Sequence, residues 1–239
     1  MKTSYERTNE LIKKIQPKSF CAAKWYNVSV WLGNGRTASC HHPLAHPVPK
    51  AELAADPSAL HNTKFKKEQR KKMLEGERPK ECGYCWKVED ETQGTEINSD
   101  RVYQTARYTE EEIEALKDIP WDKNVDPKTL EICFDNLCNL ACSYCNSEFS
   151  STWARDIVVN GEYKNMETDG GKTYRQDGSI AMPFGNKNEG NIYVKRFFDW
   201  YPEIKGGLDE LRVSGGEPSR SPSFWKLIDM SEQEPFNLA

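Results

Sequence analysis

Eight cysteines, most of them in two groups, constrain this chain more than any other sequence feature. The first group is Cys21, Cys40, Cys82 and Cys85; the second is Cys138, Cys142 and Cys145; Cys133 lies between them. In a secreted protein, an even number of cysteines would indicate a disulfide framework. Residues 1–16, however, carry charges throughout and lack the apolar stretch of a secretory signal. We therefore expect a reducing, cytoplasmic location, with metal binding or redox chemistry at the cysteines.

Composition narrows the possible partners. The 239 residues are enough for one large domain or two small ones. With 33 basic and 37 acidic residues the formal net charge is −4, which gives no support for a general nucleic-acid-binding protein. No uninterrupted apolar run approaches the roughly 20 residues of a membrane-spanning helix, so no membrane partner is expected.

The N-terminal cysteines lie on a predicted helix and hairpin. Residues 4–16 have helical spacing. Residues 27–32 are typical of a strand, and the Gly33-Asn34-Gly35 sequence that follows is typical of a tight turn. The hairpin would carry Cys21 on one arm and Cys40 at the end of the other.

A basic helix is predicted next, over residues 63–75. The stretch 64–80 has eight basic and three acidic residues, which is typical of a solvated helix face. It leads into Cys82 and Cys85. Residues 86–126 indicate a connector with one acidic helix, for which Thr109 is a candidate N-cap.

The second half of the chain has a parallel α/β pattern. Strands are expected over residues 130–134 and 208–213, and residues 160–191 indicate a long loop. A helix should begin at about Ser221, which would cap it. Its buried face would be Phe224, Trp225, Leu227 and Ile228. Only two strand–helix units are present, so we expect a parallel α/β fold that is incomplete at its C-terminus, with ligands beyond the carboxyl ends of its strands.

Three thiols within eight residues suit an iron–sulfur cluster. The C-x3-C-x2-C spacing of Cys138, Cys142 and Cys145 supplies soft ligands for iron but no fourth local ligand, which a structural zinc site would need. Asn146 stands where a c-type haem motif requires histidine. The alternative is three unrelated buried cysteines.

The triplet resembles the signature of the radical S-adenosylmethionine (SAM) family, with an aromatic residue, Tyr144, before the last cysteine. Residues 215–218, Gly-Gly-Glu-Pro, resemble the GGEP segment of that family and follow the second predicted strand. The resemblance implies that the three cysteines hold a [4Fe-4S] cluster whose fourth iron is chelated by SAM. It further implies adenine packing by Tyr144 and contact with the amino group of SAM by Gly215, Gly216, Glu217 and Pro218. Taken alone, the segment would be a plain turn.

The other four cysteines make a sufficient site for zinc or a second [4Fe-4S] cluster. Their arrangement resembles the twitch or SPASM auxiliary cluster domain found with radical SAM enzymes. The residues that carry this resemblance are Phe20-Cys21, Trp25, the Asn34-Gly35 turn before Cys40, 62–65, and 73–76 ahead of Cys82-x-x-Cys85. Here this unit precedes the barrel, which leaves open whether its cluster faces the same active site.

Other interpretations of single residues remain open. Cys82 and Cys85 have thioredoxin-like spacing, although a basic helix and Pro79 precede them rather than a strand. His41 and His42 would be ligands in a zinc version of the site but are predicted as surface residues. Cys133 is predicted to be a small buried side chain. Asp135 and Asn136 would support the loop or a ligand.

These observations predict three segments: an auxiliary cluster domain over 1–100, a linker over 101–128, and the first part of a radical SAM barrel over 129–239. The implied activity is reductive cleavage of SAM to a 5′-deoxyadenosyl radical that abstracts hydrogen from a substrate. That substrate would be a peptide, a nucleotide or a small metabolite, and a reducing electron donor is required. As an incomplete barrel, the chain is expected to turn over poorly. The alternatives are a non-catalytic zinc or iron–sulfur binding module and a thiol oxidoreductase.

Overall fold

The computed structural model describes residues 4–93, 95, 97–147, 149–161, 163 and 190–231. The chain forms two compact units. The N-terminal unit comprises Met1–Ser29 and Thr37–Thr129, and the C-terminal unit comprises Val30–Arg36 and Leu130–Ala239. The tip of the predicted hairpin therefore belongs with the C-terminal residues. In the part of the chain that is described, no helix is long and apolar enough to span a bilayer.

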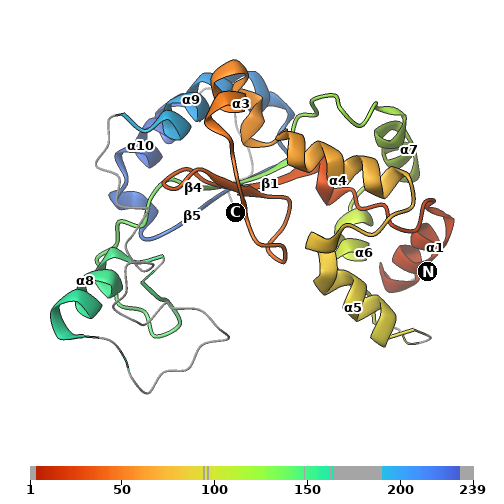
Figure 1. The fold of residues 1–239 in the computed structure, drawn as a ribbon, viewed down its shortest axis with the longest axis horizontal. Coiled ribbons are helices and arrows are strands. Elements are labelled where there is room, and N and C mark those ends of the chain that lie inside the picture. The colour runs from red at the N-terminus through yellow and green to blue at the C-terminus, as the bar shows by residue number, and fades with distance from the viewer. Residues whose placement is uncertain are drawn as a thin grey trace. The chain divides into compact units, whose positions relative to one another are not determined.

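The N-terminal unit is mostly helical (Figure 1). Its helices are α1 (Ser4–Lys14), α2 (Ala23–Tyr26), α3 (Lys50–Ala55), α4 (Lys64–Leu74), α5 (Gly83–Glu91), α6 (Asp100–Thr105) and α7 (Glu110–Asp118), with short 3-10 turns η1 (Pro57–Leu60) and η2 (Lys80–Cys82). The predicted helices at α1 and α4 are confirmed. The cap at Thr109 is also confirmed, because its side chain accepts from the Glu112 amide while the Glu112 carboxylate accepts from the Thr109 amide.

The stretch 101–128, predicted as a linker, instead contributes to the core of the N-terminal unit. It holds α7 and most of α6, and Ile113 and Leu116 are fully buried in the same cluster as Phe20 and Trp25. Three positions apart on one helix, these two apolar residues share a face. The high charge of the surrounding sequence obscures this narrow apolar stripe.

Helix α4 differs from the solvated basic helix that its composition predicts. Lys66 and Arg70 are only 1% and 0% exposed, whereas Lys71 and Lys72 on the same helix are exposed. Lys66 and Arg70 are four residues apart and therefore share one face, which packs inward with Met73. Their head groups donate to main-chain carbonyls of the unit, namely those of Asn27 and Lys24. These hydrogen bonds offset part of the cost of burying charge.

Among the residues that the structure describes, the strands form a five-stranded sheet with the order β3-β2-β1-β4-β5. Its members are β1 (Asn27–Trp31), β2 (Arg36–Ala38), β3 (His46–Pro47), β4 (Thr129–Cys133) and β5 (Glu210–Ser214). The strands of the predicted hairpin and both later strands are confirmed, but Cys21 does not lie on a hairpin arm, because α2 separates it from β1. Within the C-terminal unit, the Leu32 amide donates to the Cys133 carbonyl at 2.8 Å. Gly35, at φ 67°, lies directly against the Tyr193 ring, where no side chain would fit.

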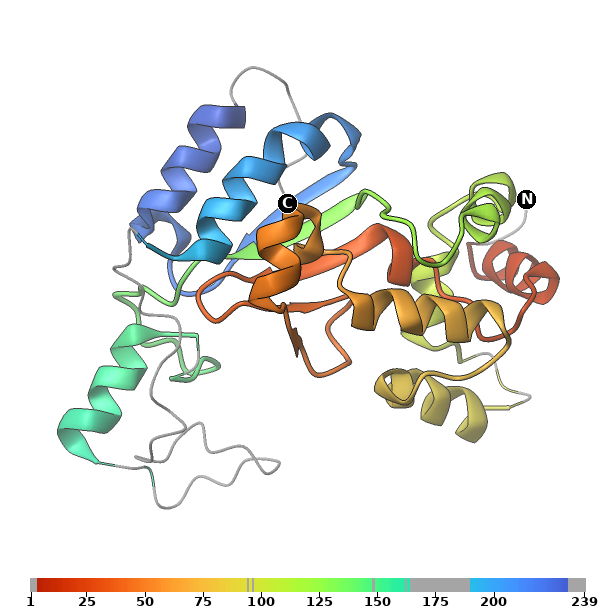
Figure 2. The same ribbon diagram turned by 45° about the horizontal axis from the view of Figure 1, so that its top comes forward.

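Helices α9 (Ile192–Ile204) and α10 (Pro222–Ser231) cover one face of β4 and β5 in the C-terminal unit (Figures 1 and 2). The other described helical elements of this unit are α8 (Ser151–Asn160) and the 3-10 turns η3 (Lys205–Gly207) and η4 (Pro218–Arg220). The Tyr201 hydroxyl of α9 and the Ser231 hydroxyl of α10 are 2.8 Å apart. Phe134, which follows β4, packs edge-on against Phe197 of α9.

Two details of α10 differ from the prediction. Leu227 is buried as expected, but Trp225 is 54% exposed, because residues two apart point to different sides of a helix. Ser221 directly precedes α10 as predicted, but the hydrogen bond of its hydroxyl goes to the Asp135 carboxylate, at 2.6 Å. Most of the predicted loop 160–191, and the C-terminal residues 232–239, lie outside the described residues.

Candidate metal centres

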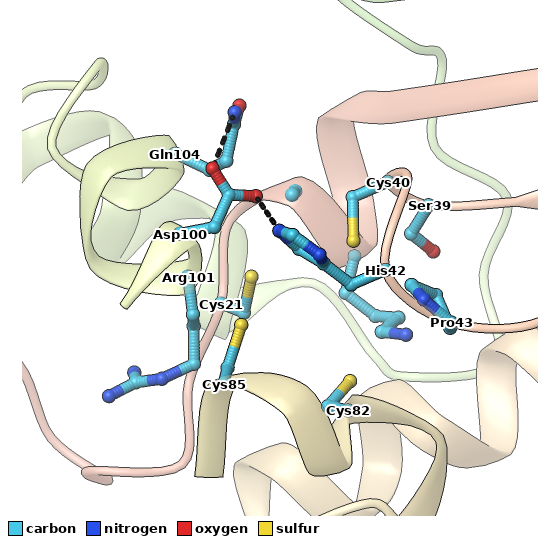
Figure 3. A pocket seen from close by; sticks show the side chains of 12 residues that line it. Cys21, Ser39, Cys40, His42, Pro43, Cys82, Cys85, Asp100, Arg101 and Gln104 are labelled. Atoms are coloured by element: carbon cyan, nitrogen blue, oxygen red, sulfur yellow. Dashed lines mark hydrogen bonds and ion pairs between the residues drawn. The ribbon is translucent and has the colours of Figure 1, made fainter. Parts of the chain in front are cut away.

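The four N-terminal cysteines line one pocket of the N-terminal unit (Figure 3). Cys21 precedes α2, Cys40 follows β2, Cys82 is the N-cap residue of α5, and Cys85 lies in the first turn of that helix. All four are free thiols. The structure thus brings together the four cysteines that the sequence analysis grouped, from three separate segments.

Burial keeps these thiols protonated in the metal-free chain. It raises the pKa of Cys21 to about 12 and that of Cys40 to about 11. The pKa values of Cys82 and Cys85 are also raised by burial. The neighbouring Cys82 and Cys40 thiols raise the pKa of Cys21 further. A metal bound here would displace these protons.

Hydrogen-bond donors point at three of the sulfurs. The backbone amides of His42 and Arg101 donate to Cys40 and Cys85, respectively. The ammonium group of Lys24 donates to Cys82. Such donors stabilise thiolates and tune a metal bound to them. Four thiols with such donors are the ligand type of an iron–sulfur cluster, whose ligands need not converge on one ion, and of a four-thiolate zinc site.

His42 is a surface residue as predicted, but it also contacts neighbouring side chains at the pocket. It is exposed, like His41, yet it lines the pocket. Its ring stacks on Tyr84 with centroids 3.9 Å apart, and its Nε2 lies 3.6 Å from Asp100 Oδ2. Among the described residues, no three His, Cys, Asp or Glu side chains converge closely enough to hold a single metal ion.

The buried thiols predict a pH dependence of the metal-free, reduced chain. The folded-state pKa of Cys21 lies above its unfolded value of 9.0, so its contribution to stability is complete below pH 9 and is lost as pH rises towards 12. The slope is about 1.4 kcal/mol per pH unit for one proton. Urea denaturation at pH 8 and pH 10.5 should show a smaller stability difference between the chain and Cys21→Ala at the higher pH. A pH-independent difference would contradict this assignment.

The second cysteine group lies in the loop between β4 and α8 of the C-terminal unit. The first turn of α8 holds this loop: the Ser151 and Thr152 hydroxyls donate to the Cys138 carbonyl at 3.1 and 2.7 Å, and Trp153 Nε1 donates to the Cys142 carbonyl at 3.1 Å. No motif in the sequence indicates these supporting residues. The polar Ser150-Ser151-Thr152 run, which begins α8, is the signal that could have pointed to them.

The three thiols of this loop are partly exposed and close to one another. The pKa of Cys145 is raised by its partial burial and by the neighbouring Cys138 and Cys142. The Leu140 amide donates to the Cys138 sulfur at 3.3 Å. Tyr144 is 90% exposed, and its hydroxyl is hydrogen-bonded to Cys142, which raises the pKa of the phenol. Three accessible thiols on one short loop are the ligand type of a cluster with three protein ligands.

The Gly-Gly-Glu-Pro segment lies against the start of the same loop. The Glu217 amide donates to the Leu137 carbonyl at 2.7 Å, and the Gly216 amide donates to the Asp135 carbonyl at 3.4 Å. A Cβ on Gly216 would stand 2.3 Å from the Leu137 oxygen. A Cβ on Gly215, which has φ 123°, would stand 2.6 Å from the Asp135 oxygen. The two glycines therefore permit the close approach of two sequence-distant motifs.

Two further expectations are confirmed in this unit. Asp135 supports the loop, because its carboxylate accepts from the Leu137 amide at 3.0 Å and from the Ser221 hydroxyl. Cys133 is buried, and its sulfur lies beside Gly215. The Glu217 carboxylate accepts from the Ser219 hydroxyl at 2.7 Å and lies on the exposed side of η4. Comparisons with family models, curated proteins and solved structures found no match to this chain.

Proposed function

We propose that the chain is an iron–sulfur protein of the radical SAM type, with a second, four-cysteine metal centre in its N-terminal unit. The observation that carries the proposal is the packing of Gly215 and Gly216 against the residues that lead into Cys138. Chance occurrence of two short motifs would not require them to meet. The resemblance assigns both motifs to one SAM-binding site, and their proximity supports that assignment.

Cys138, Cys142 and Cys145 would hold a [4Fe-4S] cluster and leave one iron without a protein ligand. Such a cluster, once reduced, would supply the single electron for reductive cleavage of SAM to methionine and a 5′-deoxyadenosyl radical. The contribution of the protein is orientation. The β4–α8 loop is held by α8 and by Asp135, and the exposed Tyr144 ring is available for stacking on an adenine.

Cys21, Cys40, Cys82 and Cys85 would hold the second centre as a [4Fe-4S] cluster or as zinc. Thiolate ligands suit both metals. The alternative function is a non-catalytic metal-binding module, which the pocket in the N-terminal unit supports by itself. The two functions differ in whether the second cysteine group binds iron and responds to SAM.

Anaerobic reconstitution with iron and sulfide tests the proposal. We expect about eight irons per chain if both centres hold [4Fe-4S] clusters, or about four if the N-terminal one holds zinc. Addition of SAM should perturb one electron paramagnetic resonance signal of the reduced protein. Simultaneous replacement of Cys138, Cys142 and Cys145 by alanine should remove about four irons and the SAM response together.

Cys133→Ala is the matched control, because it removes a thiol five residues before Cys138 without removing a proposed ligand. It should retain the iron and the SAM response. Zinc without iron in the native chain would refute the radical SAM proposal and favour the metal-binding module. Iron that is bound but insensitive to SAM would refute the open iron position. Reversible disulfide formation between Cys82 and Cys85 in the metal-loaded chain would favour the thiol oxidoreductase.

A further inference from the structure

Lys24 is a buried cation at the edge of the four-cysteine pocket. Lys24 is 2% exposed and lines the pocket together with Cys21, Cys40, Cys82 and Cys85. An ammonium group is costly to bury unless it is paired and hydrogen-bonded. The partners of Lys24 are the Glu81 carboxylate and the Cys82 sulfur, both on η2. This short turn leads directly into α5 and therefore into Cys85.

The negative charge of the proposed metal centre indicates that Lys24 has an electrostatic partner besides Glu81. Zinc with four thiolates and an oxidised [4Fe-4S] cluster with four thiolates both carry a net charge of about −2. Arg101, which also lines the pocket, is already paired with the Glu89 carboxylate at 2.8 Å. Lys24 is paired with Glu81, but it also contacts a proposed ligand. Its charge is therefore placed to act on the metal centre.

We propose that Lys24 is the buried counter-cation of the N-terminal metal centre and that it positions Cys82 as a ligand. This inference rests on the metal centre proposed above. Coulombic interaction across a few ångströms of partly desolvated protein is strong enough to alter the reduction of a cluster. Net charge and hydrogen bonds to sulfur are among the factors that set cluster potentials. Lys24 supplies both.

Redox titration of the reconstituted full-length chain tests this role. The Cys138, Cys142 and Cys145 triple alanine variant serves as background, so that only the N-terminal cluster is observed. Lys24→Met removes the positive charge, and we expect it to make one-electron reduction by dithionite about ten-fold less favourable, a fall of about 59 mV in midpoint potential. Glu81→Gln removes a negative charge beside the same centre and should shift the potential upwards.

The opposite signs separate an electrostatic role from a structural one. If Lys24 only held η2 in place through its ion pair with Glu81, Lys24→Met and Glu81→Gln would lose metal to the same extent. Lys24→Arg should restore most of the potential, because it keeps the charge. Lys72→Met, on the exposed face of α4, should leave the potential unchanged. An unchanged potential in Lys24→Met, with the cluster fully retained, would overturn the inference.

Metal analysis distinguishes failure of this inference from failure of the metal centre. A triple alanine background that binds neither iron nor zinc would refute the centre, and with it any counter-cation. If that background binds zinc instead of iron, competition against a chelator replaces the redox titration. Lys24→Met should then weaken zinc binding about ten-fold, whereas Glu81→Gln should not weaken it. Equal zinc affinity in the chain and in Lys24→Met would overturn the inference in that arm.

Discussion

Replacement of Arg70 by alanine is expected to destabilise the N-terminal unit by about 3–5 kcal/mol. The Arg70 side chain is completely buried, lies over the Trp25 ring, and donates to the Lys24 carbonyl and the Asn62 side-chain oxygen, each at 3.0 Å. Alanine would leave a cavity and remove a hydrogen-bond donor from both acceptors. Urea denaturation followed by tryptophan fluorescence would measure the loss.

Two companion variants separate packing from charge. Arg70→Met keeps most of the side-chain volume and removes the buried charge, so it should cost less than Arg70→Ala, because replacement of a buried ion by a well-packed apolar group is often tolerated. Lys72→Ala changes an exposed residue of the same helix and should stay within about 0.5 kcal/mol. Equal stability of Arg70→Ala and Lys72→Ala would show that the buried guanidinium contributes nothing.

Replacement of Gly216 by alanine is expected to separate the two motifs of the C-terminal unit. The added Cβ would stand 2.3 Å from the Leu137 oxygen and 2.7 Å from the Asn136 carbonyl carbon and oxygen. These are main-chain atoms, so the strain cannot be relieved by a side-chain rotation. We expect a loss of about 1–3 kcal/mol. Under the proposed function, the reconstituted variant should also lose the response to SAM while it keeps the N-terminal metal.

Gly206→Ala is the control for this substitution. Gly206 lies in η3, shortly before β5, and an added Cβ there would meet no atom within 4 Å. Alanine at this position should be neutral or slightly stabilising, because it reduces the freedom of the unfolded chain. Thermal melts of the two variants measure the difference. A Gly216→Ala chain as stable as Gly206→Ala would show that the loop approach is not a constraint.

Local sequence patterns predicted several of the helices and most of the strands. The Gly-Asn-Gly turn, the helix starts at Thr63 and Thr109, and the strand before Cys138 all depend on interactions within a few residues. The structure confirms each of them. Predictions that depend on which face of a helix packs against the rest of the chain were less accurate. Trp225 and the linker over 101–128 are examples, because burial depends on partners that are distant in sequence.

Cysteine spacing grouped the candidate metal ligands, since closely spaced thiols are typical soft ligands of zinc and iron–sulfur clusters. Tertiary packing placed Cys21, Cys40, Cys82 and Cys85 around one pocket and brought Gly216 to the loop before Cys138. It also turned Lys24, Lys66 and Arg70 inward. A lysine or arginine is equally polar in any sequence, and only the folded chain supplies the carbonyls, carboxylate and thiols that make its burial possible.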